Sequence, residues 1–254
     1  MDPFAAMQAE LDTVVTQVEE REILQQYLPV FYMPPDVLPD GTRRATIRFI
    51  SEWKTPGVAL THESYPKLNA TICPGTYGKS CAFCASLKSG QKSAEYPKLG
   101  TSQWYLYEIM IVQASPRHAV FAWKANMASP LGPLNILYNA RLSEKRNALI
   151  NAGATNPAEI EEQAEAFADL RTFDITLVQS GEGMHRAFVP TAHQPTPLKG
   201  VCVPASAEYL RDSFAAAKGG KKYLPQNAVV QPAQQKVAQP FDIDDFLPAD
   251  EGLI

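Results

Sequence analysis

The spacing of hydrophobic and polar residues along this 254-residue chain predicts a body made mainly of strands. Period-two alternation, and short apolar runs bounded by turn residues, predict five strands at residues 45–50, 57–60, 104–112, 119–125 and 171–181. Apolar residues three or four positions apart predict helices within residues 5–27, 130–152, 158–170 and 206–217, of which the second is short. No internal repeat is visible in the sequence.

These elements predict a mainly β fold with added helices, of the α+β class. About five strands with inserted helices and loops are compatible with a partly open β-barrel of the OB type. We therefore expect an amphipathic helix in residues 1–28, the OB-fold barrel in residues 29–200 and a C-terminal helical segment in residues 201–225. Residues 226–254 begin with a Gln-, Pro- and Ala-rich stretch, which predicts a disordered linker that ends in an acidic tail.

The net charge of −4 is unevenly distributed along the chain. Residues 1–26 carry six acidic side chains and one basic one, and residues 241–254 carry five acidic side chains and no basic one. Each end thus has a net charge of −5, which leaves +6 for residues 27–240. A basic body between acidic ends favours a polyanionic ligand, because binding depends on the local field and not on the total charge. A net charge of +6 over residues 27–240 is also compatible with ordinary surface charge.

Three of the four cysteines and one histidine fall within residues 62–84. They are His62, Cys73, Cys81 and Cys84, spaced H-x10-C-x7-C-x2-C. Zinc takes four nitrogen or sulfur ligands in a tetrahedron, and a C-x2-C pair chelates it in many structural sites. Four such ligands leave no position for a catalytic water, so the sequence predicts one structural zinc in a long irregular loop. The alternatives are a Cys73–Cys81 disulfide, or buried cysteines near an unrelated histidine.

The chain has no apolar run of the roughly 18 residues that cross a bilayer. Its first residues lack the basic start and the apolar centre of a signal peptide. We therefore expect a cytoplasmic protein, in the host cytoplasm if the protein is viral. Reducing conditions in that compartment favour a metal site over a disulfide for clustered cysteines.

The metal motif and its surroundings resemble the zinc-containing single-stranded-DNA-binding (helix-destabilising) proteins of tailed phages. Three features occur in the order of that family: the strand RRATIRFI, the metal loop with TICPGTYGKSCAFC, and the Trp- and Tyr-rich strand SQWYLYEIMIV. The resemblance covers roughly residues 43–190 together with an acidic tail rich in Asp and Phe, and the zinc loop is its specific part. The chain departs from the family at residues 1–26, which are acidic where better-known members have a short basic arm.

The resemblance implies an OB-fold with an inserted zinc subdomain. It implies sequence-independent binding of single-stranded DNA in phage DNA replication, recombination and repair. It also implies that the acidic tail docks other replication and recombination proteins, with Asp242, Asp244, Asp245 and Phe246 as the partner-binding residues. We expect no membrane partner and no small-molecule substrate.

Proteins hold single strands through basic side chains that follow the phosphates and aromatic rings on which bases stack. The candidate aromatic contacts are Tyr77, Phe83, Tyr96, Trp104, Tyr105, Tyr107 and Trp123. The candidate basic contacts are Arg43, Arg44, Arg48, Lys54, Lys67, Lys79, Lys88 and Lys124. Alternation along residues 104–112 puts Trp104 on one face and Tyr105 and Tyr107 on the other, and either face can be the core face.

Two other functions compete with this one. A zinc-stabilised protein-interaction module of the replication machinery would have no affinity of its own for single strands. A nuclease or a primase accessory would need clustered carboxylates that bind magnesium, but the acids outside the tails and residues 159–169 are scattered. We expect no catalytic residues, because no carboxylate pair, Ser-His-Asp set or phosphate-binding glycine loop is visible.

Overall fold

The computed structural model describes residues 27–64, 68–90, 95–113, 115–126, 128–196 and 203–219. The helix expected within residues 5–27 lies almost entirely outside these ranges. The linker and the acidic tail, with Asp242, Asp244, Asp245 and Phe246, lie outside them as well.

The described strands form one sheet. They are β1 (Arg43–Phe49), β2 (Gly57–Ser64), β3 (Leu68–Ile72), β4 (Gly100–Ile111), β5 (Arg117–Lys124), β6 (Phe173–Ser180) and β7 (Ala187–Pro195). The order across the sheet is β3-β2-β4-β1-β6-β7, and β5 pairs with the other edge of β4. All named pairs are antiparallel, and the sheet is not closed in the described part of the chain.

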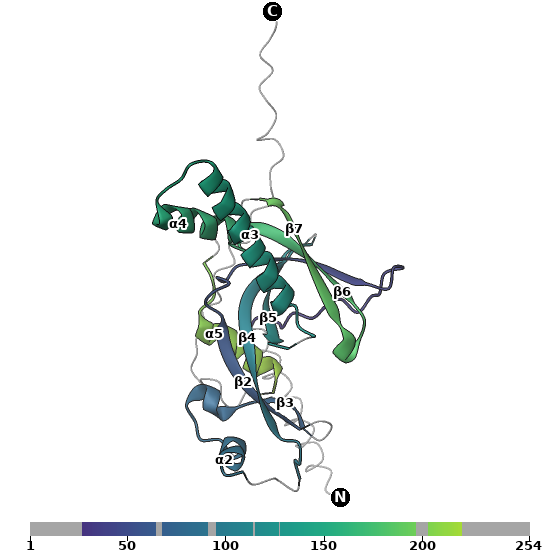
Figure 1. Ribbon diagram of the computed structural model, residues 1–254. Helices are drawn as coiled ribbons and strands as arrows, with labels where there is room; N and C mark the ends of the chain where they lie inside the picture. The colour runs from purple at the N-terminus through teal and green to yellow at the C-terminus, as the bar shows by residue number, and fades with distance from the viewer. Residues whose placement is uncertain are drawn as a thin grey trace, which may run out of the picture.

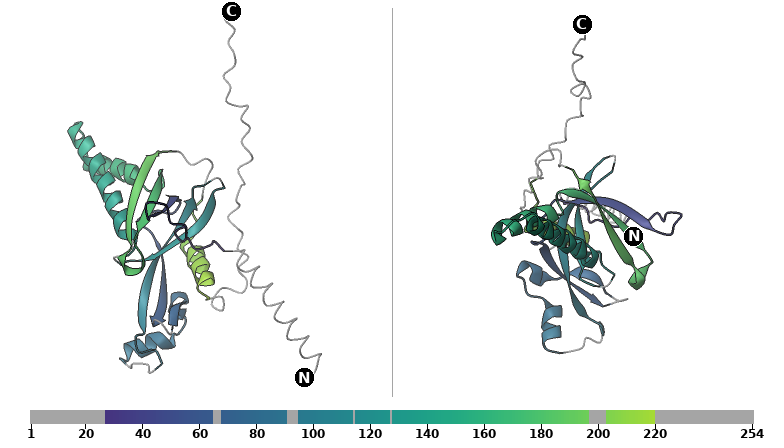
Figure 2. Two further views of the ribbon diagram at one scale, coloured as in Figure 1. Left: turned by 90° about the vertical axis from the view of Figure 1, so that its right-hand side faces the viewer. Right: turned by 45° about the horizontal axis from the view of Figure 1, so that its top comes forward.

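The described part of the chain also contains six helical segments. They are η1 (Pro74–Tyr77), α2 (Ala82–Lys88), α3 (Leu131–Asn151), α4 (Pro157–Ala168), η2 (Gly183–His185) and α5 (Ala207–Ala217). Polar caps fix two of the starts: the Asn156 side chain accepts from Ala158 N, and the Ser206 hydroxyl accepts from Tyr209 N. The views in Figure 1 and Figure 2 place α3 on one side of β4 and β5 and α5 on the other.

Strand β4 contributes to two separate hydrophobic cores, because its alternate side chains point to opposite faces. Tyr107 and Ile109 belong to the first core, which α3 covers and which also contains Phe49 and Phe121. Leu106 belongs to the second core, which α5 covers with residues that include Leu210, Phe214 and Ala215. Burial of large apolar side chains on both faces therefore fixes the middle of β4.

The structure confirms the expected mixed α+β class, and it corrects three details. Seven described strands are present where five were expected, the additional ones being β3 and β7. Residues 62–84 are not an irregular loop, because they include the end of β2, β3, η1 and the start of α2. The helix within residues 130–152 is not short, since α3 has 21 residues. The sheet is not closed in the residues that the structure describes, and the partly open OB-type barrel stays a prediction.

Among the described residues, no helix combines the length and the apolar character that crossing a bilayer requires.

Candidate metal centre and aromatic face

The four expected metal ligands come from β2, the end of β3 and the start of α2, which lie at one end of the molecule (Figure 1). His62 lies near the end of β2, and Cys73 directly follows β3. Cys81 is the N-cap residue of α2, and Cys84 lies in its first turn, so the two thiols face the same side. We call this part of the chain, namely the end of β2 with β3, η1 and α2, the metal module.

The ligand atoms of these four residues converge on one point. The Nε2 atom of His62 lies 3.2 Å from Cys81 Sγ and 3.4 Å from Cys84 Sγ, and Cys73 Sγ lies 3.5 Å from Cys84 Sγ. All four atoms lie within 4.8 Å of one another. Zinc–sulfur and zinc–nitrogen bonds of about 2.3 and 2.0 Å place tetrahedral ligand atoms roughly 3.5–3.8 Å apart, so the set can hold a metal ion such as zinc. The three cysteines are free, which excludes the Cys73–Cys81 disulfide in this structure.

The electrostatics of the cluster also fit a cation. Burial and the neighbouring Cys84 thiol raise the pKa of the Cys73 thiol to about 12, so the Cys73 thiolate needs a positive charge beside it, such as a metal ion. Burial lowers the pKa of His62, which keeps its imidazole neutral and able to donate a lone pair. The other ring nitrogen, Nδ1, lies 3.2 Å from Thr101 Oγ1, a contact that orients the ring. With four nitrogen and sulfur ligands the set is closed, as in structural sites.

Two candidate nucleic-acid contacts are buried, and their assignment is corrected here. Arg48 is 3% exposed; its guanidinium donates to Asp174 Oδ1 (2.6 Å) and to the Thr196 carbonyl (2.5 Å). Tyr107 is 4% exposed, stacks on Trp53 and belongs to the first core. Neither side chain can reach a nucleic acid without unfolding of the region around it.

Other basic candidates already have acidic partners. The ion pairs are Arg43–Glu182, Arg44–Asp40, Lys54–Glu165 and Lys124–Glu63. Two aromatic candidates pack against α5: the Trp104 ring lies 5.1 Å from that of Phe214, and the Tyr77 ring lies 4.9 Å below the Arg211 guanidinium. The structure thus gives these side chains roles in packing or charge pairing. Lys67 lies outside the described residues.

The remaining aromatic candidates lie along one face of the sheet and its continuation into the metal module. Val58, Tyr105 and Trp123 are directly opposite one another on β2, β4 and β5, so their side chains form a row on one face. Tyr105 and Trp123 are half-buried, and Val58 is 43% exposed. Toward the metal module the same face continues to His62, whose ring contacts Phe83 at 5.3 Å, and the Phe83 ring contacts that of Tyr96 at 5.6 Å. We call Val58, Tyr105, Trp123, Phe83 and Tyr96 the aromatic face.

The structure adds two residues that sequence reasoning missed. The guanidinium of Arg186 lies 5.7 Å from the centroid of the Trp123 ring, and Phe188 packs edge-on against the same ring at 5.2 Å. Both come from η2 and β7, a region where no strand was expected. An alternating stretch after residue 186 is present, but two prolines interrupt it and weaken the signal for a strand.

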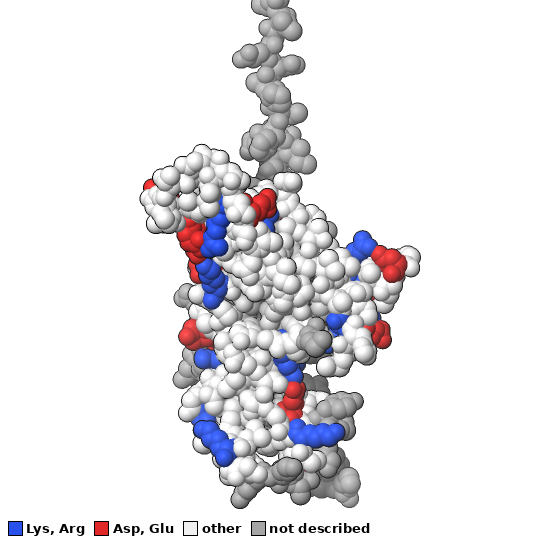
Figure 3. All heavy atoms as spheres, viewed as in Figure 1, with Lys and Arg blue, Asp and Glu red and all other residues white. Residues whose placement is uncertain are grey.

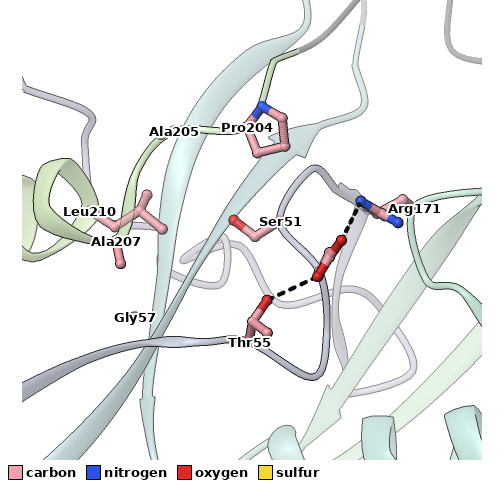
Figure 4. A pocket seen from close by; sticks show the side chains of 9 residues that line it. Ser51, Thr55, Gly57, Arg171, Pro204, Ala205, Ala207 and Leu210 are labelled. Carbon is pink, nitrogen blue, oxygen red and sulfur yellow. Dashed lines mark hydrogen bonds and ion pairs between the residues drawn. The ribbon is translucent and has the colours of Figure 1, made fainter.

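A separate pocket of about 320 Å³ lies between the turn after β1, Arg171 and the segment that leads into α5 (Figure 4). Its lining residues are Ser51, Glu52, Thr55, Gly57, Arg171, Pro204, Ala205, Ala207 and Leu210. Arg171 is held by Asp169 at 2.7 Å and by Glu52 at 3.5 Å, so its charge is already balanced. We assign this pocket no ligand.

The four metal ligands thus lie next to the aromatic face, whose rings are partly accessible. Lys79 and Lys88, which flank two of the cysteines, are exposed. A scan against protein-family models gives no match for this chain. A search of curated proteins finds no relative of significant similarity.

Proposed function

We propose that this chain is a sequence-independent single-stranded-DNA-binding protein with one structural zinc, which acts in phage DNA replication, recombination and repair. The aromatic face is the observation that carries the proposal. The rings of Tyr105 and Trp123 lie opposite each other on β4 and β5, beside Val58 on β2, and each ring is half-buried, so it is held in place and keeps part of its surface accessible. Stacking on such rings contributes about 1–3 kcal/mol per base and is tolerant of sequence, because every base has a π face.

Positive charge around this face supports the same function. Arg186 lies over the Trp123 ring, and Lys79, Lys88 and Lys98 are exposed on or beside the metal module. Figure 3 shows Lys and Arg side chains, with Asp and Glu side chains beside some of them, at both margins of the part of the molecule that holds β2, β3 and α2, and uncharged surface between the margins. A strand of nucleic acid that stacks on the rings would therefore have cations on either side for its phosphates.

Zinc would have a structural role in this proposal. The ligands His62 and Cys84 lie beside Phe83, so the bound metal would hold this ring and the neighbouring lysines in position before DNA arrives. Order that exists before binding does not have to be created during binding, which improves affinity. The order β3-β2-β4-β1-β6-β7 supports, as part of the same proposal, an OB-type barrel that is open in the described part of the chain.

The acidic tail is proposed to dock replication and recombination proteins. The three acids and two phenylalanines within residues 241–246 combine charge with apolar anchors. Deletion of residues 241–254 should abolish docking of such proteins and should leave the metal content unchanged. Unchanged docking by the truncated protein would remove this part of the proposal.

The binding proposal is tested by titration of the purified protein with fluorescent oligo-dT and with duplex of equal length at two salt concentrations. We expect strong binding to the single strand, with log K falling against log salt by about 0.7 per phosphate contact. Trp123→Ala should weaken binding by about 1–3 kcal/mol. Tyr32→Ala is the control, because Tyr32 is 67% exposed but lies outside the aromatic face.

Equal affinity for duplex and single strand, or a flat salt response, would reject the proposal. A protein with intact zinc and no affinity for either nucleic acid would instead favour the interaction module.

A further inference from the structure

Two lysine ammonium groups and one carboxylate meet over a tryptophan ring on the α5 side of the sheet. Lys124, the last residue of β5, contacts both carboxylate oxygens of Glu63 at 2.6 Å and lies 5.2 Å from the Trp104 ring centroid. Lys218, which caps the C-terminus of α5, lies 5.2 Å from the same ring and 5.7 Å from the ring of Phe214. The indole N–H of Trp104 donates to Thr61 Oγ1, which fixes the ring beneath the charges.

The charges in this group do not balance. Glu63 is already engaged by Lys124 and by the Ser102 hydroxyl at 2.8 Å. The ammonium of Lys218 makes no hydrogen bond or ion pair with any residue that the structure describes. Burial, and then repulsion from Lys124, lower the pKa of Lys218. The Glu63 carboxylate attracts both ammonium groups, and contact with aromatic rings offsets the loss of hydration in part, but two lysines and one carboxylate leave a net charge of +1 in this half-buried group.

The position of this group relates it to the aromatic face. Trp123 and Lys124 are consecutive on β5, so Trp123 points to the aromatic face and Lys124 to the α5 side. In the described part of the chain, β5 pairs only with β4, apart from the bridge between Val30 and Val120. No described strand covers the outer edge of residues 122–124. An extended polymer on the aromatic face can thus pass around this edge and reach both lysines.

We propose that Lys218 and Lys124, above the Trp104 ring, form an oxyanion site for a phosphate group. Two ammonium groups with only one carboxylate present the point charges that phosphate oxygens accept. In the setting of the proposed function, on which this part rests, the ligand is a backbone phosphate of a single strand that crosses the edge of β5. Free inorganic phosphate offers the same chemistry, and the two sources are separated by the measurements below.

The test compares Lys218→Gln with Lys145→Gln in the full chain. Lys145 is a matched control, because its ammonium also lies over an aromatic ring, that of Phe167 at 5.9 Å, but on α3. Lys218→Gln should lower affinity for oligo-dT several-fold and should reduce the slope of log K against log salt by about 0.7, the value for one phosphate contact. Lys218→Arg should retain the slope, and Lys145→Gln should change neither quantity. Circular dichroism and zinc content confirm that each variant is folded.

A second measurement does not depend on DNA. Line broadening of inorganic phosphate in ³¹P NMR should be visible with the wild-type protein and lost with Lys218→Gln. Loss of this broadening with an unchanged salt slope for oligo-dT would support the oxyanion site and overturn the path around the edge. Unchanged phosphate binding and an unchanged slope together would overturn the site itself. If the wild-type protein binds no single strand, the proposed function fails, and the phosphate measurement still decides whether the site exists.

Discussion

The body of this protein and its metal module are stabilised in different ways. In the body, large side chains such as Phe49, Phe121 and Phe173 are fully buried in a core that several strands and α3 share. In the metal module, η1 and α2 bury no side chain, and the four ligands are the groups that converge there. The body therefore depends on apolar area and close packing, whereas the module depends on coordination. Each region should respond to its own kind of perturbation.

Removal of the metal should give the largest difference between the two regions. Structural zinc contributes on the order of 10–16 kcal/mol in small zinc peptides, and the module has little apolar burial to replace it. Chelation, or Cys81→Ser with Cys84→Ser, should abolish protection of the module in hydrogen exchange and leave β1 and β6 protected. Metal analysis and exchange mass spectrometry are the measurements. Cys202→Ser, at a cysteine outside the described residues, is the control and should retain the metal. Full metal content in the double variant would disprove the ligand assignment.

Removal of a large side chain from the core of the body should destabilise the body and leave the metal module intact. Phe121 is fully buried and contacts the rings of Phe31 and Phe49 at 5.9 and 5.5 Å. Phe121→Ala should lower the free energy of unfolding by about 3–5 kcal/mol, through lost transfer energy and a cavity. Urea denaturation measures this loss, and the folded variant should still contain one zinc per chain. A Phe121→Ala protein that is folded but lacks zinc would show that the two regions are not separable in this way.

Replacement of Arg48 should destabilise the body and leave the aromatic face unaffected. Arg48→Ala removes one partner of a buried ion pair, and we expect a loss of about 3 kcal/mol, near the lower end for such pairs, because Asp174 is partly exposed. Thermal or urea unfolding measures the loss. Affinity for oligo-dT, measured below the unfolding transition, should not change. Arg44→Ala, at an exposed pair with Asp40, should cost less than about 1 kcal/mol. A specific loss of DNA affinity in folded Arg48→Ala would restore Arg48 as a contact.

The smallest effect concerns the junction of the module with α5. Burial raises the pKa of Asp212 above its ordinary value of 3.8, by more than the neighbouring Tyr77 hydroxyl and the Arg211 guanidinium lower it. Between 3.8 and that raised pKa, the folded state binds more protons than the unfolded state, so Asp212 makes stability fall as pH rises. Asp212→Asn should remove this contribution in urea unfolding at several acidic pH values.

Asp40 offers a control with the opposite sign. Hydrogen bonds from Thr42 lower its pKa, so its contribution is present above the unfolded value of 3.8 and is lost as pH falls through the lowered pKa. Asp40→Asn should therefore remove a contribution that makes the free energy of unfolding rise with pH, whereas Asp212→Asn should remove one that makes it fall. If Asp212→Asn leaves the pH dependence of the free energy of unfolding unchanged, burial of this carboxylate does not contribute to that dependence.

The ligand set was predictable from sequence because its information is local. The spacing of Cys81 and Cys84 forms a chelating pair within one helical turn, and Cys73 and His62 lie close along the chain. The central strands were predictable for a similar reason, since alternation over the long β4 is a strong signal. The short β3 and the proline-containing β7 give weak signals and were missed.

The roles of individual aromatic and basic residues depend on distant partners. Tyr105 and Tyr107 share one face of β4, but only Tyr107 lies in the core that α3 covers. Arg48 is buried because Asp174, 126 residues away in sequence, lies beside it. No local pattern contains this information, since it arises when β1 pairs with β6. Sequence therefore identified residues of a suitable chemical type for the site, but it did not predict which of them are buried.

The length of strand β4 sets the distance between the body and the metal module. It has 12 residues and pairs with β1, β2 and β5, so it runs without a hinge from the body into the metal module (Figure 1). At about 3.3 Å per residue it spans roughly 40 Å. Insertion of two residues would lengthen this span by about 7 Å and keep every side chain on its face, whereas insertion of one would reverse the faces beyond it. An insertion that keeps regular pairing and leaves both hydrophobic cores of β4 intact would therefore add residues in pairs.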